Sequence, residues 1–117
     1  MLQHVALETR TDDVEAALAF WALLGFEPID VPPGLRDRAV WIGSGGTHIH
    51  LLLTDAPVVP QQGHAAVVVE DYDATIAALR AAGHAAEPRA EHWGAPRTFV
   101  RDPTGHRVEV TAAAAPG

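Results

Sequence analysis

The sequence contains no cysteine and no lysine among its 117 residues. Without cysteine, the chain has no disulfide framework, no thiolate metal site and no thiol nucleophile. Because lysine is missing, arginine supplies all eight basic side chains, and the formal net charge is −7. Nucleic acids and anionic lipid surfaces bind basic footprints, so this charge balance argues against either kind of partner.

Long hydrophobic runs are also missing. No stretch approaches the roughly 20 apolar residues of a membrane span, and the segment "MLQHVALETR" (1–10) lacks the basic start and apolar run of a signal peptide. An apolar content of 48% and a charged content of 20% are typical of a globular protein. We therefore expect a soluble cytoplasmic protein that forms one domain over residues 1–117.

The chain repeats one pattern twice. The segments that begin at His4 and His64 each start with an apolar strand, followed by acidic residues, a helical pattern, a glycine and a short Glu-Pro strand. Turn-forming stretches then separate two further strands in each half. The pattern predicts the order β-α-β-β-β twice, with module 1 at about 1–54, a linker at 55–63 and module 2 at about 64–113.

Local signals support these elements. Asp12, with a glutamate three residues later, forms a capping pattern that predicts the start of the first helix. Asp71 or Asp73 starts the second helix, and a glycine follows each helical stretch. The sequence "DPTG" (102–105) has Asp, Pro and Gly where a type I turn prefers them. It therefore predicts a turn between the last two strands.

Two pairs of metal-binding side chains occupy equivalent places in the two halves. His4 and His50 are 46 residues apart, and His64 and Glu109 are 45 residues apart. Imidazole nitrogen and carboxylate oxygen are ligands that borderline divalent metals accept. Strand alternation places small alanine side chains beside both first-strand histidines, which leaves room for a bound group.

A duplicated module with these positions resembles the vicinal oxygen chelate superfamily, which contains glyoxalases, bleomycin resistance proteins and extradiol dioxygenases. The resemblance implies an α+β fold in which two tandem βαβββ modules form a U-shaped mixed sheet around a central cavity. It also implies a metal ion that chelates vicinal oxygens of a substrate. Four segments carry the resemblance: "HVAL" (4–7), "AFWALLGFEP" (19–28), "GHAAVVVED" (63–71) and "FVRDPTGHRVEV" (99–110).

By position, His4, His64 and Glu109 fall on the family's two-histidine, one-glutamate ligand set. His50 falls where glyoxalase I and the epimerases usually have Glu or Gln, and this departure argues against glyoxalase I activity itself. His50 is either a fourth ligand or a pocket histidine that hydrogen-bonds the substrate. The resemblance implies one divalent ion (Zn, Ni, Co, Mn or Fe(II)). It also makes Glu109 the catalytic candidate for moving a proton.

Other side chains could surround a bound substrate. Core packing is an alternative for Trp41, and Arg97 would either bind an anionic substrate or pair with an acidic side chain. His48 is expected at the surface or beside the ligands, whereas His84 and His106 are expected in solvent. The predicted substrate-binding residues are Trp41, Trp93, Arg97 and Phe99.

We expect a metal-dependent enzyme of the glyoxalase/dioxygenase type, with lyase, isomerase or dioxygenase chemistry on a small molecule. The alternative is a non-catalytic protein of the bleomycin-resistance type that sequesters a bulky cationic drug. The acidic net charge favours this alternative, while the intact ligand set opposes it. A homodimer is expected in either case.

Overall fold

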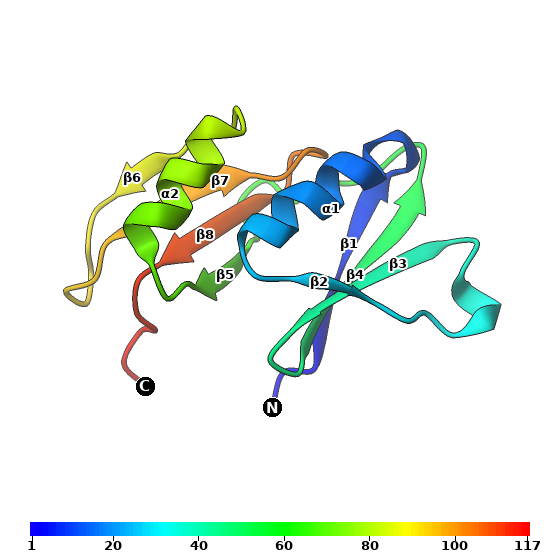
Figure 1. The fold of residues 1–117 in the computed structure, drawn as a ribbon, viewed down its shortest axis with the longest axis horizontal. Helices are drawn as coiled ribbons and strands as arrows, with labels where there is room; N and C mark the ends of the chain where they lie inside the picture. The colour runs from blue at the N-terminus through cyan, green and yellow to red at the C-terminus, as the bar shows by residue number, and fades with distance from the viewer. The chain divides into compact units, whose positions relative to one another are not determined.

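The computed structural model describes residues 1–117, which form two compact units. Unit 1 contains Met1–Val59 and unit 2 contains Pro60–Gly117. The boundary between the units falls inside the predicted linker 55–63. Each unit has a strand, a helix and three further strands in that order (Figure 1).

In unit 1 the strand order is β1-β4-β3-β2. The first and last strands, β1 and β4, are parallel, and the other neighbours are antiparallel. Short 3-10 helices at Thr11–Asp13 and Pro33–Leu35 lie between these elements. The elements of unit 1 are β1 (His4–Arg10), α1 (Val14–Leu23), β2 (Glu27–Ile29), β3 (Ala39–Ser44) and β4 (Thr47–Thr54).

Unit 2 repeats this topology with the strand order β5-β8-β7-β6. Its first and last strands are again parallel, and the other pairs are antiparallel. The prediction of an α+β fold built from tandem βαβββ modules is therefore confirmed. The elements of unit 2 are β5 (Ala65–Val68), α2 (Tyr72–Ala81), β6 (Glu87–Arg89), β7 (Arg97–Arg101) and β8 (Arg107–Thr111).

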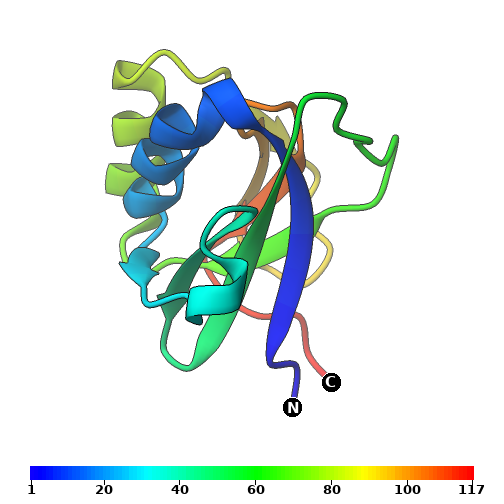
Figure 2. The ribbon, with the colours of Figure 1, turned by 90° about the vertical axis from the view of Figure 1, so that its right-hand side faces the viewer.

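Each helix lies on one face of the sheet of its own unit (Figure 2). In unit 1 the side chains of Phe20 and Trp21 on α1 are fully buried, together with Leu51 on β4. Burying a side chain such as Phe20 contributes roughly 2–3 kcal/mol. Because side chains alternate along a strand, His48 and His50 of β4 point to the face without a helix.

The two helices start differently. At α2, Asp71 is the N-cap, and its carboxylate accepts a hydrogen bond from the Ala74 N–H at 3.0 Å, as one of the predicted alternatives required. At α1 the prediction of an Asp12 cap is wrong, because a 3-10 turn precedes the helix and makes Asp13 the N-cap, without a side-chain cap bond. Neither ten-residue helix is long and apolar enough to span a membrane.

The predicted turn between β7 and β8 is present. The Gly105 N–H donates to the Asp102 carbonyl at 2.9 Å, and the Asp102 carboxylate accepts backbone N–H bonds from Thr104, Gly105 and His106. The expectation that His106 is in solvent is wrong, since only 4% of it is exposed. Alternation explains this burial, because His106 shares the helix-covered face with Val108 and Val110.

Candidate functional site

On unit 1, the sheet face opposite α1 carries a stack of three rings. The His50 ring lies between those of His4 and Trp41, with centroid distances of 4.0 Å and 3.9 Å and interplanar angles of 17° and 3°. Trp41 is the direct partner of His50 on β3, and Ala6 is its partner on β1. The small Ala6 side chain leaves space for the His4 ring, and Trp41 packs against the histidines rather than in the helix-side core.

Gln3 joins His4 of this stack to His48, a role that the sequence analysis missed. Its side-chain oxygen accepts a hydrogen bond from His4 Nδ1, while its Nε2–H donates to His48 Nδ1 at 3.1 Å. With the amide in this orientation, His4 carries its proton on Nδ1 and has a free lone pair on Nε2. No motif marks Gln3, whose only sequence signal is its position directly before His4.

His50 is kept neutral by its surroundings. Only 8% of the residue is exposed, and its pKa is lowered first by burial, which disfavours the charged imidazolium, and then by repulsion from His4 and His48. Neutral imidazole is the form that binds metals. A pocket of about 420 Å³ opens beside it. Its lining includes Leu35, Arg38, Trp41, His50 and Leu52.

In unit 2, His64 and Glu109 face each other. His64 Nε2 and Glu109 Oε2 are 3.6 Å apart, and only 7% of Glu109 is exposed. His64 Nδ1 bonds the Gln62 carbonyl oxygen at 2.9 Å, so Nδ1 carries a proton. In the neutral ring, Nε2 therefore presents a lone pair toward a carboxylate oxygen. Two acceptors repel each other unless a proton or a metal ion lies between them.

Arg97 holds the other oxygen of this carboxylate. Arg97 Nε donates to Glu109 Oε1 at 2.5 Å, and Arg97 Nη1 donates to the Ala90 carbonyl at 2.9 Å. Of the two alternatives for Arg97, the structure shows pairing with an acidic side chain, and that side chain is the candidate ligand. Phe99, the direct β7 partner of Glu109, packs against the His64 ring in a T-shaped arrangement, with ring centroids 5.2 Å apart.

Trp93 makes its hydrogen bond to another part of unit 2. Its indole Nε1–H donates to the Ala113 carbonyl at 3.0 Å, so it fastens the loop before β7 to the chain after β8. No hydrogen bond or ring contact joins Trp93 to His64, Glu109 or Phe99.

The candidate ligands thus form two pairs, which we call half-sites: His4 with His50 in unit 1, and His64 with Glu109 in unit 2. No group of three or more His, Asp or Glu side chains in the structure is arranged to hold a metal ion. Each half-site nevertheless has the donor chemistry of a metal site. In each, an outer hydrogen bond fixes the tautomer of the first-strand histidine, as in many metal-binding histidines.

Solved structures with similar folds include three whose names indicate their class. A glyoxalase family protein from Bacillus anthracis is 26% identical, with a TM-score of 0.85, and the match covers 95% of this chain and 93% of that chain. Lactoylglutathione lyase from Agrobacterium tumefaciens is 24% identical (TM-score 0.69, coverage 95% and 92%). Oxidase ChaP-H2 is 21% identical (TM-score 0.77, coverage 97% and 94%). At these lower identities, the last two show the fold alone.

No curated protein sequence matches this chain significantly. The family model described as the glyoxalase/bleomycin resistance protein/dioxygenase superfamily matches residues 1–110. With the duplicated βαβββ topology, this match shows that the chain belongs to the glyoxalase/bleomycin resistance protein/dioxygenase superfamily.

Proposed function

We propose that the protein is a cytoplasmic metal-dependent enzyme of the glyoxalase/dioxygenase type that acts on a small molecule with vicinal oxygens. One divalent ion would be bound by His4, His50, His64 and Glu109. Superfamily members commonly use a divalent metal, and some of them are lyases or oxidases. The proposal includes a homodimer, in which the second half-site comes from the same chain or from its partner.

The observation that carries the proposal is the gap between His64 Nε2 and Glu109 Oε2. Two ligand atoms at zinc bond lengths in a tetrahedral site are about 3.3 Å apart, and these two acceptors are 3.6 Å apart. The remaining oxygen of Glu109 is already held by Arg97. The donor set therefore fits a metal through one imidazole nitrogen and one carboxylate oxygen.

The chain's own residues would divide the chemical work. When bound, the metal supplies a Lewis acid that stabilises negative charge on a substrate oxygen. Glu109 is also the candidate to move a proton through Oε2, which Arg97 does not engage and which is the same oxygen that would bind the metal. Trp41 and the apolar pocket beside His50 would hold the carbon skeleton of the substrate. This arrangement supports lyase, isomerase or dioxygenase chemistry.

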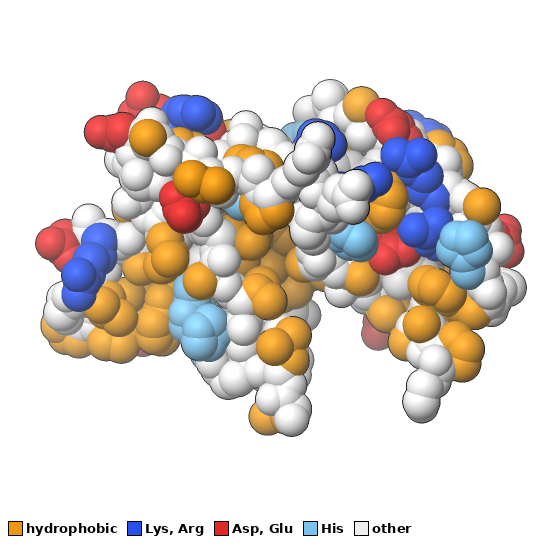
Figure 3. All heavy atoms as spheres, turned by 180° about the vertical axis from the view of Figure 1, so that it is seen from behind, with side chains coloured by type: hydrophobic (Ala, Val, Ile, Leu, Met, Phe, Trp, Pro, Cys, Tyr) orange, Lys and Arg blue, Asp and Glu red, His pale blue; other side chains and the backbone are white.

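Sequestration of a cationic drug is less well supported. In Figure 3, which shows the chain from behind, basic side chains gather over unit 2, and four arginines lie on strands β6, β7 and β8. A bulky cation would be repelled by this surface. A protein that only sequesters a drug would also not require the metal-binding side chains of the two half-sites.

Elemental analysis after equilibration with Zn, Ni, Co, Mn and Fe(II), followed by desalting, tests the proposal. We expect about one ion per chain in the wild type and a loss of the ion in His4→Ala and His64→Ala. His92→Ala is the matched control, because His92 is exposed and belongs to neither half-site. A wild type that binds no ion, or an ion that both ligand variants retain, contradicts the proposal.

A further inference from the structure

Positive charge is concentrated on one face of the unit 2 sheet, although the chain has a net charge of −7. Strand alternation places Arg97, Phe99 and Arg101 on the same face of β7. Their β6 and β8 partners, including Arg89 and Arg107, lie on this face too. Half of the eight arginines of the chain therefore share one small surface with Phe99.

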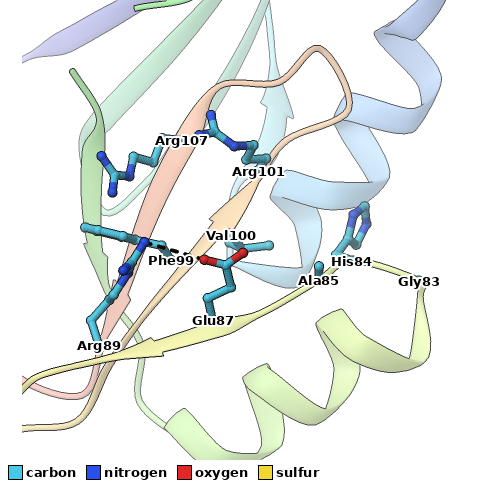
Figure 4. Close-up of a pocket in the computed structure, with 9 residues that line it drawn as sticks. All are labelled: Gly83, His84, Ala85, Glu87, Arg89, Phe99, Val100, Arg101 and Arg107. Carbon is cyan, nitrogen blue, oxygen red and sulfur yellow. Dashed lines mark hydrogen bonds and ion pairs between the residues drawn. The ribbon is translucent and has the colours of Figure 1, made fainter. Parts of the chain in front are cut away.

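A pocket of about 260 Å³ opens within this surface. It contains three guanidinium groups and one carboxylate, so the lining carries an excess of two positive charges. Figure 4 shows Arg101 and Arg107 coming from neighbouring strands, with Glu87 and Arg89 on the β6 side. The lining includes His84, Glu87, Arg89, Phe99, Arg101 and Arg107.

Arg101 and Arg107 are directly opposite each other on β7 and β8. Like charges in this position destabilise a sheet. Arg89 on β6 and Arg97 on β7 are also directly opposite each other. In this pair each positive charge has an acidic partner: Glu87 lies 3.5 Å from Arg89, and Glu109 lies 2.5 Å from Arg97.

Neither Arg101 nor Arg107 forms an ion pair with a carboxylate. Arg101 Nη1 donates only to the Gly105 carbonyl, at 2.9 Å. Arg107 has no hydrogen bond or ion pair, and its guanidinium lies over the Phe99 ring at 4.0 Å from the centroid. Stacking on an aromatic ring fixes the plane of a guanidinium and leaves its N–H groups free to bind an anion.

We propose that Arg101 and Arg107 form an anion-binding clamp for the carboxylate or phosphate group of a small organic ligand. Guanidinium groups bind both oxyanions through paired, charge-assisted hydrogen bonds, and an anion between the two arginines would remove their repulsion. The pocket is smaller than the usual 300–1,000 Å³ or so of a site that encloses a whole drug-sized ligand. It therefore fits an anionic group with a few attached atoms.

Phe99 links this clamp to the unit 2 half-site, since the same ring contacts Arg107 and the His64 ring. An anion held by the clamp would thus place the rest of the ligand beside His64 and Glu109. That the ligand is the substrate rests on the proposed function, and it makes the substrate class an organic acid or an organic phosphate. Anion binding itself requires no metal.

Isothermal titration of metal-free protein with inorganic phosphate and with benzoate, at low ionic strength, tests the clamp. We expect saturable binding of at least one of the two, weakened at least about tenfold in Arg101→Gln and in Arg107→Gln, because each loses a charge-assisted bond. Arg10→Gln, an arginine of unit 1, is the charge-matched control and should bind like the wild type. The tighter probe identifies the anionic group as phosphate or carboxylate.

Thermal unfolding provides a second measurement that also checks folding. At the same anion concentration, the bound anion should raise the Tm of the wild type more than the Tm of either clamp variant, because a ligand stabilises the folded state according to its affinity. Saturable binding of neither anion, or binding that both substitutions leave intact, overturns the proposal. A wild type that binds no metal ion in the elemental analysis but still binds the anion would instead overturn the proposed function alone.

Discussion

The two units share one backbone plan but carry different chemistry on the same sheet positions. Trp41 and Phe99 are the direct partners of His50 and Glu109 in their respective sheets. In unit 1 the face holds stacked aromatic rings, whereas in unit 2 it holds a carboxylate and arginines. The strand register thus fixes where a functional side chain lies, and the side chains beside it on the sheet determine which partners it contacts.

The largest expected effect is on stability, and it differs between an ion pair of unit 2 and an ion pair of unit 1. Arg97→Gln should reduce the free energy of unfolding by about 3 kcal/mol, because it leaves the buried Glu109 carboxylate without its partner. Arg10→Gln, which removes an exposed pair with Asp13, should cost less than about 1 kcal/mol. Urea unfolding of the metal-free proteins measures both, and equal costs would contradict the comparison.

A double variant sharpens this result. Arg97→Gln combined with Glu109→Gln should recover most of the lost stability, since no buried charge remains unpaired. If the double variant is as unstable as Arg97→Gln, then packing of the arginine against Phe99 accounts for the loss instead.

The next effect tests how the first-strand histidines are oriented. In unit 1 the acceptor for His4 Nδ1 is the Gln3 side chain, whereas in unit 2 the acceptor for His64 Nδ1 is the main-chain carbonyl of Gln62. If the proposed function holds, Gln3→Ala should weaken metal binding about 10- to 100-fold. Gln62→Ala should leave it unchanged. Competition with a metal chelator measures the affinities. Equal losses of metal affinity in the two variants would contradict the contrast between a side-chain acceptor for His4 and a main-chain acceptor for His64.

A smaller effect distinguishes the two helix starts. Asp71→Ala should cost about 1 kcal/mol, because it removes the cap bond to the Ala74 N–H. Asp12→Ala should change stability by less than about 0.5 kcal/mol, since this exposed side chain does not cap α1. Urea midpoints compare the two variants, and a cost at Asp12 that matches the cost at Asp71 would restore the rejected cap.

The smallest expected effect concerns acid. The pKa of His50 lies below the ordinary value of 6.5, so the unfolded chain takes up a proton at this residue before the folded protein does. His50 therefore leaves stability unaffected well above pH 6.5 and lowers it as the pH falls through 6.5 toward the folded-state pKa. His50→Gln should show a shallower loss than the wild type in metal-free urea unfolding, and His92→Gln should not. Parallel pH profiles in all three proteins would contradict this.

The sequence predicted the order of elements because each signal is local. Glycines after the helices, apolar alternation and the "DPTG" turn each specify nearby backbone. The candidate histidines could be placed on a strand face for the same reason. The start of α1 was missed because a 3-10 turn shifts the cap by one residue, which the capping pattern does not encode.

Side-chain partners were less predictable. Arg97 is opposite Thr111 in the register, yet its side chain reaches along the strand to Glu109. The contact of Gln3 with His48 likewise depends on β1 lying beside β4, whose residues are far away in the sequence. Such contacts follow from strand pairing and side-chain length together, so local patterns do not reveal them.

The parallel pairing of each unit's first and last strands has a consequence for how the protein is made. His4 pairs in register with His48, so β1 has no place in its sheet until β4 has been synthesised. Long-range strand pairing of this kind forms late in folding. During translation, the stack of the His4, His50 and Trp41 rings can assemble only after nearly the whole of unit 1 has left the ribosome. The assembled stack is therefore a marker of a completed module on the nascent chain.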